Sequence, residues 1–176
     1  MPSFRTARRV RHTAQEMFDL VADVESYPQF LPLCQGLRVL KRQTTDAGLE
    51  VITAEMQVGY KAIRERFTSR VTLDRASKDI LVEYVDGPFS KLENRWSFRE
   101  DTTTTGPACR VDFFINYEFR SRTLGLLMGS MFDTAFRKFS EAFETRAHGV
   151  YGRPGTHSSA EPDPSPSSPE KPVAKP

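Results

Sequence analysis

The histidines and cysteines of this sequence do not form a recognisable catalytic or metal-binding motif. His12, His148 and His157 lack metal-ligand spacing, and the serine elbow, glycine-rich phosphate loop and zinc-protease motifs are absent. Cys34 and Cys109 lie far apart and form no C-x-x-C pair or Cys/His cluster, which argues against a disulfide framework or a zinc site. Cys34 has no candidate general base spaced near it, so we interpret it as a small apolar residue. We therefore expect no enzymatic activity, no bound metal and no resident cofactor.

Two polar side chains fall on strand faces that are otherwise apolar. Alternation places Glu65 on the same face as Phe67, and Asn94 on the same face as Trp96. A buried carboxylate or amide without a partner costs several kcal/mol, so each of these groups needs one. Two interpretations stay open for Glu65: it pairs internally or returns to solvent through a β-bulge, or it helps to hold a polar group of a ligand through a neighbouring donor.

Alternating apolar and polar residues predict that most of the chain is β-structure. The expected strands are residues 3–10, 37–43, 49–58, 63–74, 80–86, 92–99 and 109–120, with turns at 46–48, Gly59, 86–88 and 106–107. The short links favour an antiparallel meander. One face of it is strongly apolar and comprises Ile52, Ala54, Met56, Val58, Ile63, Phe67, Val71, Leu73, Leu92, Trp96, Phe98, Val111, Phe113, Ile115, Tyr117 and Phe119.

Three helical segments are expected around these strands. Thr13 and Glu16 have capping-box spacing, which predicts a helix that begins there and ends before Pro28. Residues 27–34 are then a proline-punctuated second helix or turn. A long helix is expected from about residue 122 to 147. Its apolar positions are Leu124, Leu127, Met128, Met131, Phe132, Ala135, Phe136, Phe139, Ala142 and Phe143, with Asp133, Arg137, Ser140, Glu141 and Glu144 opposite.

Gly125 and Gly129 should loosen the first two turns of the long helix, because each glycine costs a helix up to ~1 kcal/mol relative to alanine. Close packing against the sheet is one explanation for these glycines. The other is a lid that opens to admit a long ligand.

The element order predicts an α+β fold in which a curved antiparallel sheet of about seven strands wraps around the long C-terminal helix, with two short helices after the first strand. A helix laid across a curved sheet leaves an apolar space unless large side chains fill it, and small hydrophobic ligands bind in such spaces. The competing interpretation is that the aromatic residues simply form a packed core.

Composition divides the chain into one globular domain, residues 1–152, and a tail, residues 153–176. The tail has seven prolines, five serines and no aromatic residue, so we expect it to be disordered.

No apolar run reaches the ~20 residues that span a bilayer, and no secretory signal is evident, so a soluble protein of a reducing cytoplasm is expected. A net charge of +2 does not indicate DNA binding. The early arginines, Arg5, Arg8, Arg9 and Arg11, indicate either a solvated strand face or a contact with anionic membrane or RNA.

Three strings carry a family resemblance across most of the domain. They are Asp23-Val24-Glu25-Ser26-Tyr27-Pro28-Gln29-Phe30-Leu31-Pro32; Val58-Gly59-Tyr60 leading to Arg64-Glu65-Arg66-Phe67-Thr68-Ser69-Arg70-Val71; and Gly87-Pro88-Phe89 with Leu92 and Trp96-Ser97-Phe98. In this order they resemble the coenzyme Q-binding subfamily of the START-like, polyketide cyclase/dehydrase superfamily. The superfamily name does not imply cyclase activity, because the fold hosts enzymes and carriers.

The resemblance implies a START-like helix-grip fold that binds ubiquinone or a precursor, as a ligand rather than a cofactor, in support of respiration and quinone biosynthesis. We expect a cytoplasmic protein that can make peripheral contact with the inner (cytoplasmic) membrane. Bacterial members of the family include ribosome-association toxins, so a regulator bound to the large ribosomal subunit is the alternative, and a polyketide cyclase-type enzyme is a third. The residues expected to contact the ligand are Phe30, Leu33, Ala54, Met56, Ile63, Glu65, Phe67, Asn94, Trp96, Phe113, Ile115, Leu124, Met128, Met131 and Phe132.

Overall fold

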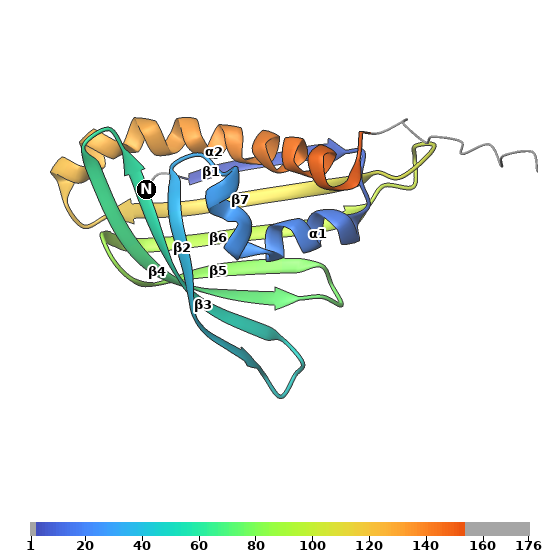
Figure 1. Cartoon of the computed structure of the whole chain (residues 1–176), viewed down its shortest axis with the longest axis horizontal. Helices are drawn as coiled ribbons and strands as arrows, with labels where there is room; N and C mark the ends of the chain where they lie inside the picture. Colours follow the sequence, from blue (N-terminus) through green and yellow to red (C-terminus); the bar gives the residue numbers. More distant parts are fainter. Residues whose placement is uncertain (1–2, 154–176) are drawn as a thin grey trace, which may run out of the picture.

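Seven antiparallel strands form one curved sheet, and a long helix runs along it (Figure 1). The computed structural model describes residues 3–153, so nearly all of the tail predicted to be disordered lies outside the described residues. The strands are β1 (Ser3–Val10), β2 (Cys34–Thr44), β3 (Glu50–Tyr60), β4 (Ile63–Asp74), β5 (Asp79–Asp86), β6 (Phe89–Glu100) and β7 (Cys109–Phe119). Their order is β1-β7-β6-β5-β4-β3-β2, a meander from β2 to β7 that β1 closes along one edge. The α+β prediction is confirmed.

Irregular register bends the sheet at the β2 edge. The pairing of β2 with β3 shifts between Cys34 and Gly36 and again between Val39 and Lys41. Bulges of this kind increase the local twist of a strand. As a result, β2, β3 and β4 turn away from the plane of β5 to β7 and form a concave face (Figure 1).

The turn between β3 and β4 differs from its prediction. Gly59 lies within β3, and the strands reverse over Lys61 and Ala62, with Lys61 at a φ of 54°. The backbone N–H of Gly59 donates instead to the carbonyl of Leu33, at 3.0 Å. Gly59 therefore ties the β3 end to the segment before β2 rather than making the turn.

The first short helix begins as expected, and the second is shorter and tighter. In α1 (Ala14–Ala22), Thr13 Oγ1 accepts from the N–H of Glu16 while Glu16 Oε1 accepts from the N–H of Thr13, both at 3.0 Å. The second is a 3₁₀ helix, η1 (Val24–Gln29), and not a helix over residues 27–34. Pro28 lacks a backbone N–H, which limits continuation of the helix. The chain enters β2 at Cys34.

The long helix α2 (Arg122–Tyr151) extends four residues beyond its predicted end and stops at Gly152, whose φ is 90°. Its predicted faces are wrong at two positions. Leu127, expected in the core, is 58% exposed, and Ser140, expected at the surface, is 8% exposed. The Oγ of Ser140 has no hydrogen-bond partner among the described residues. The helix therefore leaves more of its N-terminal half exposed than its apolar spacing predicts.

An aromatic cluster built around Phe89 joins the sheet to the start of α2. The Phe89 ring stacks on Phe119 with centroids 4.8 Å apart and meets the edge of Phe67 at 5.4 Å. Gly87 precedes it at a φ of 138°, and a Cβ there would lie 2.7 Å from the Cβ of Phe67. Arg120 Nε donates to the Phe89 carbonyl at 2.9 Å. The Gly-Pro-Phe turn thus requires glycine and fixes the loop from which α2 begins.

Candidate ligand-binding site

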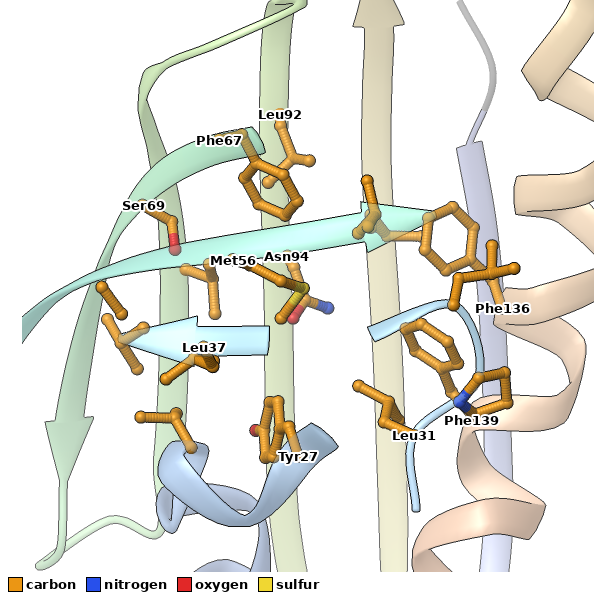
Figure 2. A pocket seen from close by; sticks show the side chains of 18 of the residues that line it. Tyr27, Leu31, Leu37, Met56, Phe67, Ser69, Leu92, Asn94, Phe136 and Phe139 are labelled. Carbon is orange, nitrogen blue, oxygen red and sulfur yellow. The ribbon is translucent and has the colours of Figure 1, made fainter. Parts of the chain in front are cut away.

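A cavity of about 100 Å³ lies between the concave face of the sheet, η1 and the middle of α2 (Figure 2). Eight of the residues predicted to contact a ligand line it: Leu33, Ala54, Met56, Phe67, Asn94, Trp96, Ile115 and Phe132. Six of them come from β3, β4, β6 and β7, which the antiparallel register brings onto one face, while Leu33 precedes β2 and Phe132 belongs to α2. Phe136 and Phe139 of α2 complete the wall on the helix side. The wall is almost entirely apolar.

Asn94 is the most clearly positioned polar group of the cavity wall. Its Oδ1 accepts from the indole Nε1–H of Trp96 at 2.8 Å, and its Nδ2 donates to the carbonyl of Phe114 at 2.8 Å. The buried amide therefore has the partners that its position demanded. Because an amide has two N–H donors and Phe114 takes one, a second donor remains for a ligand.

Ser69 is a second polar group in the wall, and the prediction omitted it. It follows Phe67 by two residues on β4, so alternation alone would have placed it inward. It is buried and lines the cavity. A hydroxyl on an apolar wall can donate to a carbonyl oxygen of a ligand.

Tyr27 and Cys34 add no reactive group to the cavity region. The Tyr27 hydroxyl donates to the carbonyl of Val21, and burial raises the pKa of this phenol well above its ordinary value. Burial also raises the pKa of the Cys34 thiol to about 11, against a smaller opposing effect of the Gly36 backbone. Both groups therefore stay protonated at neutral pH, and neither is poised as a nucleophile or base.

Four of the predicted contact residues are held in the surrounding core or at the edge of the cavity. Phe113 packs behind Trp96, with ring centroids 4.6 Å apart. Met128 is fully buried against the core but does not line the cavity, and Leu124 is partly buried beside it. Phe30 packs edge-on against other aromatic rings and does not face the cavity.

Glu65 does not reach the cavity either. It is half-buried on β4, directly opposite Val58 of β3, with two residue pairs between it and the β3–β4 turn. Its carboxylate forms no ion pair with any residue of 3–153. Ile63 is likewise half-buried at that turn and outside the cavity wall. The internal pairing considered for Glu65 is absent, and partial exposure to solvent accounts for the carboxylate.

A surface groove of about 390 Å³ lies beside this cavity. Its walls are the segment before β2, the end of β3 and one face of α2, which contributes the predicted contact residue Met131. Pro32 and Leu33 line both the groove and the cavity. Leu33 holds a φ of 66°, a left-handed conformation that is strained for a leucine. The strained residue therefore stands where the two spaces meet.

Within residues 3–153, no group of three or more His, Cys, Asp or Glu side chains could hold a metal ion. No described helix is long and apolar enough to cross a bilayer. Both free cysteines are buried.

Three of the early arginines have partners: Arg8 pairs with Glu144 and Arg9 with Asp101, each at 2.6 Å, while Arg5 lies 4.9 Å from the centre of the Phe114 ring.

Known proteins with similar sequences include a ribosome association toxin and a coenzyme Q-binding protein. The ribosome association toxin RatA of Escherichia coli is 36% identical over 151 residues, which cover 86% of this chain and 90% of the relative. The mitochondrial coenzyme Q-binding protein COQ10 homolog B of Xenopus laevis is 31% identical over 140 residues, covering 79% of this chain and 55% of the relative.

Solved structures support the same fold. An 18 kDa protein from Caulobacter crescentus is 33% identical, with a TM-score of 0.69, and covers 87% of this chain and 100% of its own. A START superfamily protein from Mycobacterium smegmatis is 19% identical, with a TM-score of 0.68, and covers 84% of this chain and 98% of its own. The second likeness shows the START-like fold alone.

The model of one protein family spans most of the described domain. It is the family described as polyketide cyclase / dehydrase and lipid transport, and it matches residues 10–144. The match includes all of η1, and it includes α2 as far as Glu144. It also includes the whole sheet apart from most of β1. The chain is a member of the polyketide cyclase / dehydrase and lipid transport family, with a START-like fold.

Proposed function

We propose that the protein binds a polyprenyl quinone, such as ubiquinone or a precursor, and carries or shields it without transforming it. The observation that supports this most directly is an apolar cavity whose wall offers hydrogen-bond donors at Ser69 and Asn94. A quinone ring is flat and apolar and has carbonyl oxygens that only accept hydrogen bonds. The coenzyme Q-binding name of the Xenopus relative points to the same ligand class.

Donor chemistry assigns the polar contacts. An ionised carboxylate accepts hydrogen bonds only, as a quinone carbonyl does, so Glu65 cannot bind the ring directly. The Ser69 hydroxyl and the second N–H of Asn94 can each donate to a quinone oxygen. Trp96 keeps the Asn94 amide in position from the other side, because its indole N–H occupies Oδ1.

The size of the cavity requires it to widen on binding. A cavity of about 100 Å³ is smaller than the ~150 Å³ that accommodates benzene, and much smaller than ordinary ligand pockets of about 300–1,000 Å³. The ring therefore enters only if side chains of the wall, such as Phe136 and Phe139 on α2, move outward. We expect the isoprenoid tail to follow the groove past Pro32 and Leu33, where about 390 Å³ is already open.

The acidities of Tyr27 and Cys34 argue for a binding protein rather than an enzyme. The ionisable groups at or beside the cavity, Tyr27 and Cys34, have raised pKa values and remain neutral at physiological pH. General acid–base catalysis needs a group whose pKa lies near the working pH.

Mass spectrometry of an organic extract of the purified protein tests this proposal. Protein produced in a quinone-containing host should yield bound quinone, and Ala54→Trp, which fills the cavity from β3, should yield much less. Ala7→Trp, on the exposed side of edge strand β1, is the matched control and should retain quinone. Wild-type protein without extractable quinone, or an Ala54→Trp variant that still carries it, would contradict the proposal.

A regulator that binds the large ribosomal subunit is the second candidate. It is favoured by the higher identity to the Escherichia coli ribosome association toxin and by the arginines on the outer face of the sheet. Several of these already pair with acids, as Arg70 does with Glu83 at 3.2 Å and Arg95 with Glu93. Cosedimentation with isolated large subunits, weakening steeply as salt increases, would support this candidate over a carrier.

A further inference from the structure

The two most exposed large apolar side chains of α2 lie near its N-terminal end, close to the groove. Leu126 is 85% exposed and Leu127 is 58% exposed, although burial of a leucine is normally favourable. Tyr60, 39% exposed at the end of β3, lies across the groove from Met131. Leu127 precedes Met131 by four residues, so the two share a helix face. We call Tyr60, Leu126, Leu127 and Met131 the apolar end patch.

Cationic groups flank this patch. Lys61 follows Tyr60 in the β3–β4 turn and holds its ammonium 5.2 Å from the centre of that ring. Arg122 is the exposed first residue of α2, and Lys138 lines the groove further along the helix. The first turn of α2 contains no acidic residue, although helix N-termini favour acids, and the sequence from Arg120 to Phe132 has none.

The apolar end patch adjoins the cavity. Tyr60 and Met131 line the groove, which shares Pro32 and Leu33 with the cavity wall. Figure 1 shows the β3–β4 turn and the first turns of α2 at the same end of the molecule. A hydrophobic molecule that leaves a membrane at this end would therefore meet apolar side chains next to the cavity, although the groove is also lined by Ser130, Thr134 and Lys138.

We propose that this end of the molecule docks on a bilayer that contains anionic phospholipid, with Leu126 and Leu127 inserted and Lys61 and Arg122 against the headgroups. Two exposed leucines beside cations match a membrane interface, whose interior is apolar and whose surface is negative. The helix N-terminus adds positive potential on the same side. The docking surface deepens the proposed carrier function, since it gives the ligand a route from the bilayer into the cavity.

The β1 arginines are the competing surface, and the structure argues against them. Arg8 and Arg9 already pair with Glu144 and Asp101, and no large apolar side chain of β1 is prominently exposed. Cations without an apolar anchor bind membranes only through electrostatics that salt screens.

Cosedimentation of the purified full chain with phosphatidylcholine vesicles, with and without phosphatidylglycerol, tests this docking. Wild-type protein should bind the anionic vesicles better, and a Leu126→Ser, Leu127→Ser variant should bind about tenfold or more weakly. Lys61→Glu with Arg122→Glu should remove the preference for anionic vesicles. Val150→Ser, at a position 52% exposed near the other end of α2, is the matched control and should bind like wild type.

Several results would overturn the docking surface. They are failure of the wild type to bind either vesicle, normal binding by the double-serine variant, and loss of binding on reversing Arg5, Arg9 and Arg11 instead. Loss of self-association or of ribosome binding in the double-serine variant, without any vesicle binding by the wild type, would identify a protein or ribosomal partner and also overturn it. Solvent extraction separates this outcome from failure of the carrier function: vesicle binding without extractable quinone refutes the ligand, and extractable quinone without vesicle binding refutes the docking.

Discussion

The two halves of α2 are held in the molecule in different ways. Near the C-terminal end, Glu144 pairs with Arg8 at 2.6 Å, His148 lies 2.9 Å from His12, and Tyr151 donates to the Glu16 carbonyl at 3.2 Å. These contacts join the helix to β1 and α1. Toward the N-terminal end, the polar link to the sheet is the hydrogen bond of 3.0 Å from Tyr117 to Asp133.

This difference shows where the fold can open. A helix with polar anchors at one end and mainly apolar packing, such as that of Met128 and Phe132, at the other can shift over the groove while the far end stays in place. Local opening of this kind needs less free energy than global unfolding. The cavity must widen for a quinone, and the half of α2 with fewer polar links to the rest of the molecule borders the neighbouring groove.

The largest expected difference between the two halves is in the free energy of unfolding after loss of a buried side chain from the anchored half. Phe143 packs edge-on against Phe30 at 5.1 Å and Trp96 at 5.2 Å. Phe143→Ala should reduce the free energy of unfolding by about 3–5 kcal/mol, measured by urea denaturation. Leu127→Ala, in the exposed half, should change it by at most about 0.5 kcal/mol. Similar losses at both positions would show that the two halves are packed alike.

Thiol labelling compares the two regions without changing the helix. Cys34 lies beside the cavity, whereas Cys109 is fully buried at the start of β7, and burial raises the pKa of the Cys109 thiol to about 12. In single-cysteine variants at one pH, Cys34 should be alkylated at least about tenfold faster, because local opening exposes it and only larger unfolding exposes Cys109. Equal labelling rates, measured by mass spectrometry, would mean that the groove side opens no more readily than the anchored side.

Labelling also has to allow for the different acidities of the two thiols. The pKa is raised to about 11 at Cys34 and to about 12 at Cys109, and both return to ordinary values once exposed. If labelling occurs only in the open state, its rate depends on how often each site opens and on the ordinary pKa of an exposed thiol. The ratio of the two rates should therefore persist when the pH is changed. A ratio that disappears after adjustment for thiolate fraction would show direct attack on the closed form.

Acid should weaken the anchored half through its buried histidine. Burial lowers the pKa of His12 below 6.5, and the nearby charge of His148 lowers it further, against smaller opposing effects of Glu16 and Glu144. The unfolded chain therefore binds more protons than the folded chain below about pH 6.5, so stability is complete above that pH and falls as the pH decreases. Each unit of pKa depression contributes about 1.4 kcal/mol. Urea denaturation across this range should show a smaller decrease for His12→Gln, and an unchanged slope in that variant would contradict the assignment.

The strands were predictable because alternation is a local property. The β1 and β4 boundaries match the predicted ranges, and the inward positions of Ala54, Asn94 and Ile115 follow from counting along each strand. Cavity membership was less predictable. Phe113 and Ile115 share a face of β7, yet only Ile115 reaches the cavity, because sheet curvature decides which part of that face remains uncovered.

The prediction of the buried and exposed faces of α2 was partly wrong for a related reason. Leu124, Leu127 and Met128 have the spacing of one helix face, and sequence cannot tell how wide a part of that face the sheet will cover. Met128 is 1% exposed whereas Leu127 is 58% exposed, so the covered part is narrower here than the apolar spacing suggests. Ser140 is buried because the helix lies against β1 and α1 further along, where the surface covers a wider part of its circumference. Both errors concern long-range packing rather than local preference.

The smallest effect concerns the glycines of the exposed half. A Cβ at Gly125 would lie 3.8 Å from Phe119, and a Cβ at Gly129 would meet nothing within 4 Å, so close packing does not require glycine at either position. Gly125→Ala and Gly129→Ala should each raise the free energy of unfolding by up to about 1 kcal/mol through helix propensity.

If these glycines keep the groove side loose, the two substitutions should also slow the uptake of quinone from vesicles while leaving the amount bound at equilibrium nearly unchanged. Gly149→Ala is the matched control, because its Cβ also meets nothing within 4 Å but it lies in the anchored half. It should stabilise the helix by a similar or smaller amount and leave uptake as fast as in the wild type. Equal slowing by all three substitutions would attribute the effect to general helix stability. Slowing by Gly125→Ala and Gly129→Ala alone would assign the opening motion to the first two turns of α2, because the three variants then differ only in which half of the helix they stiffen.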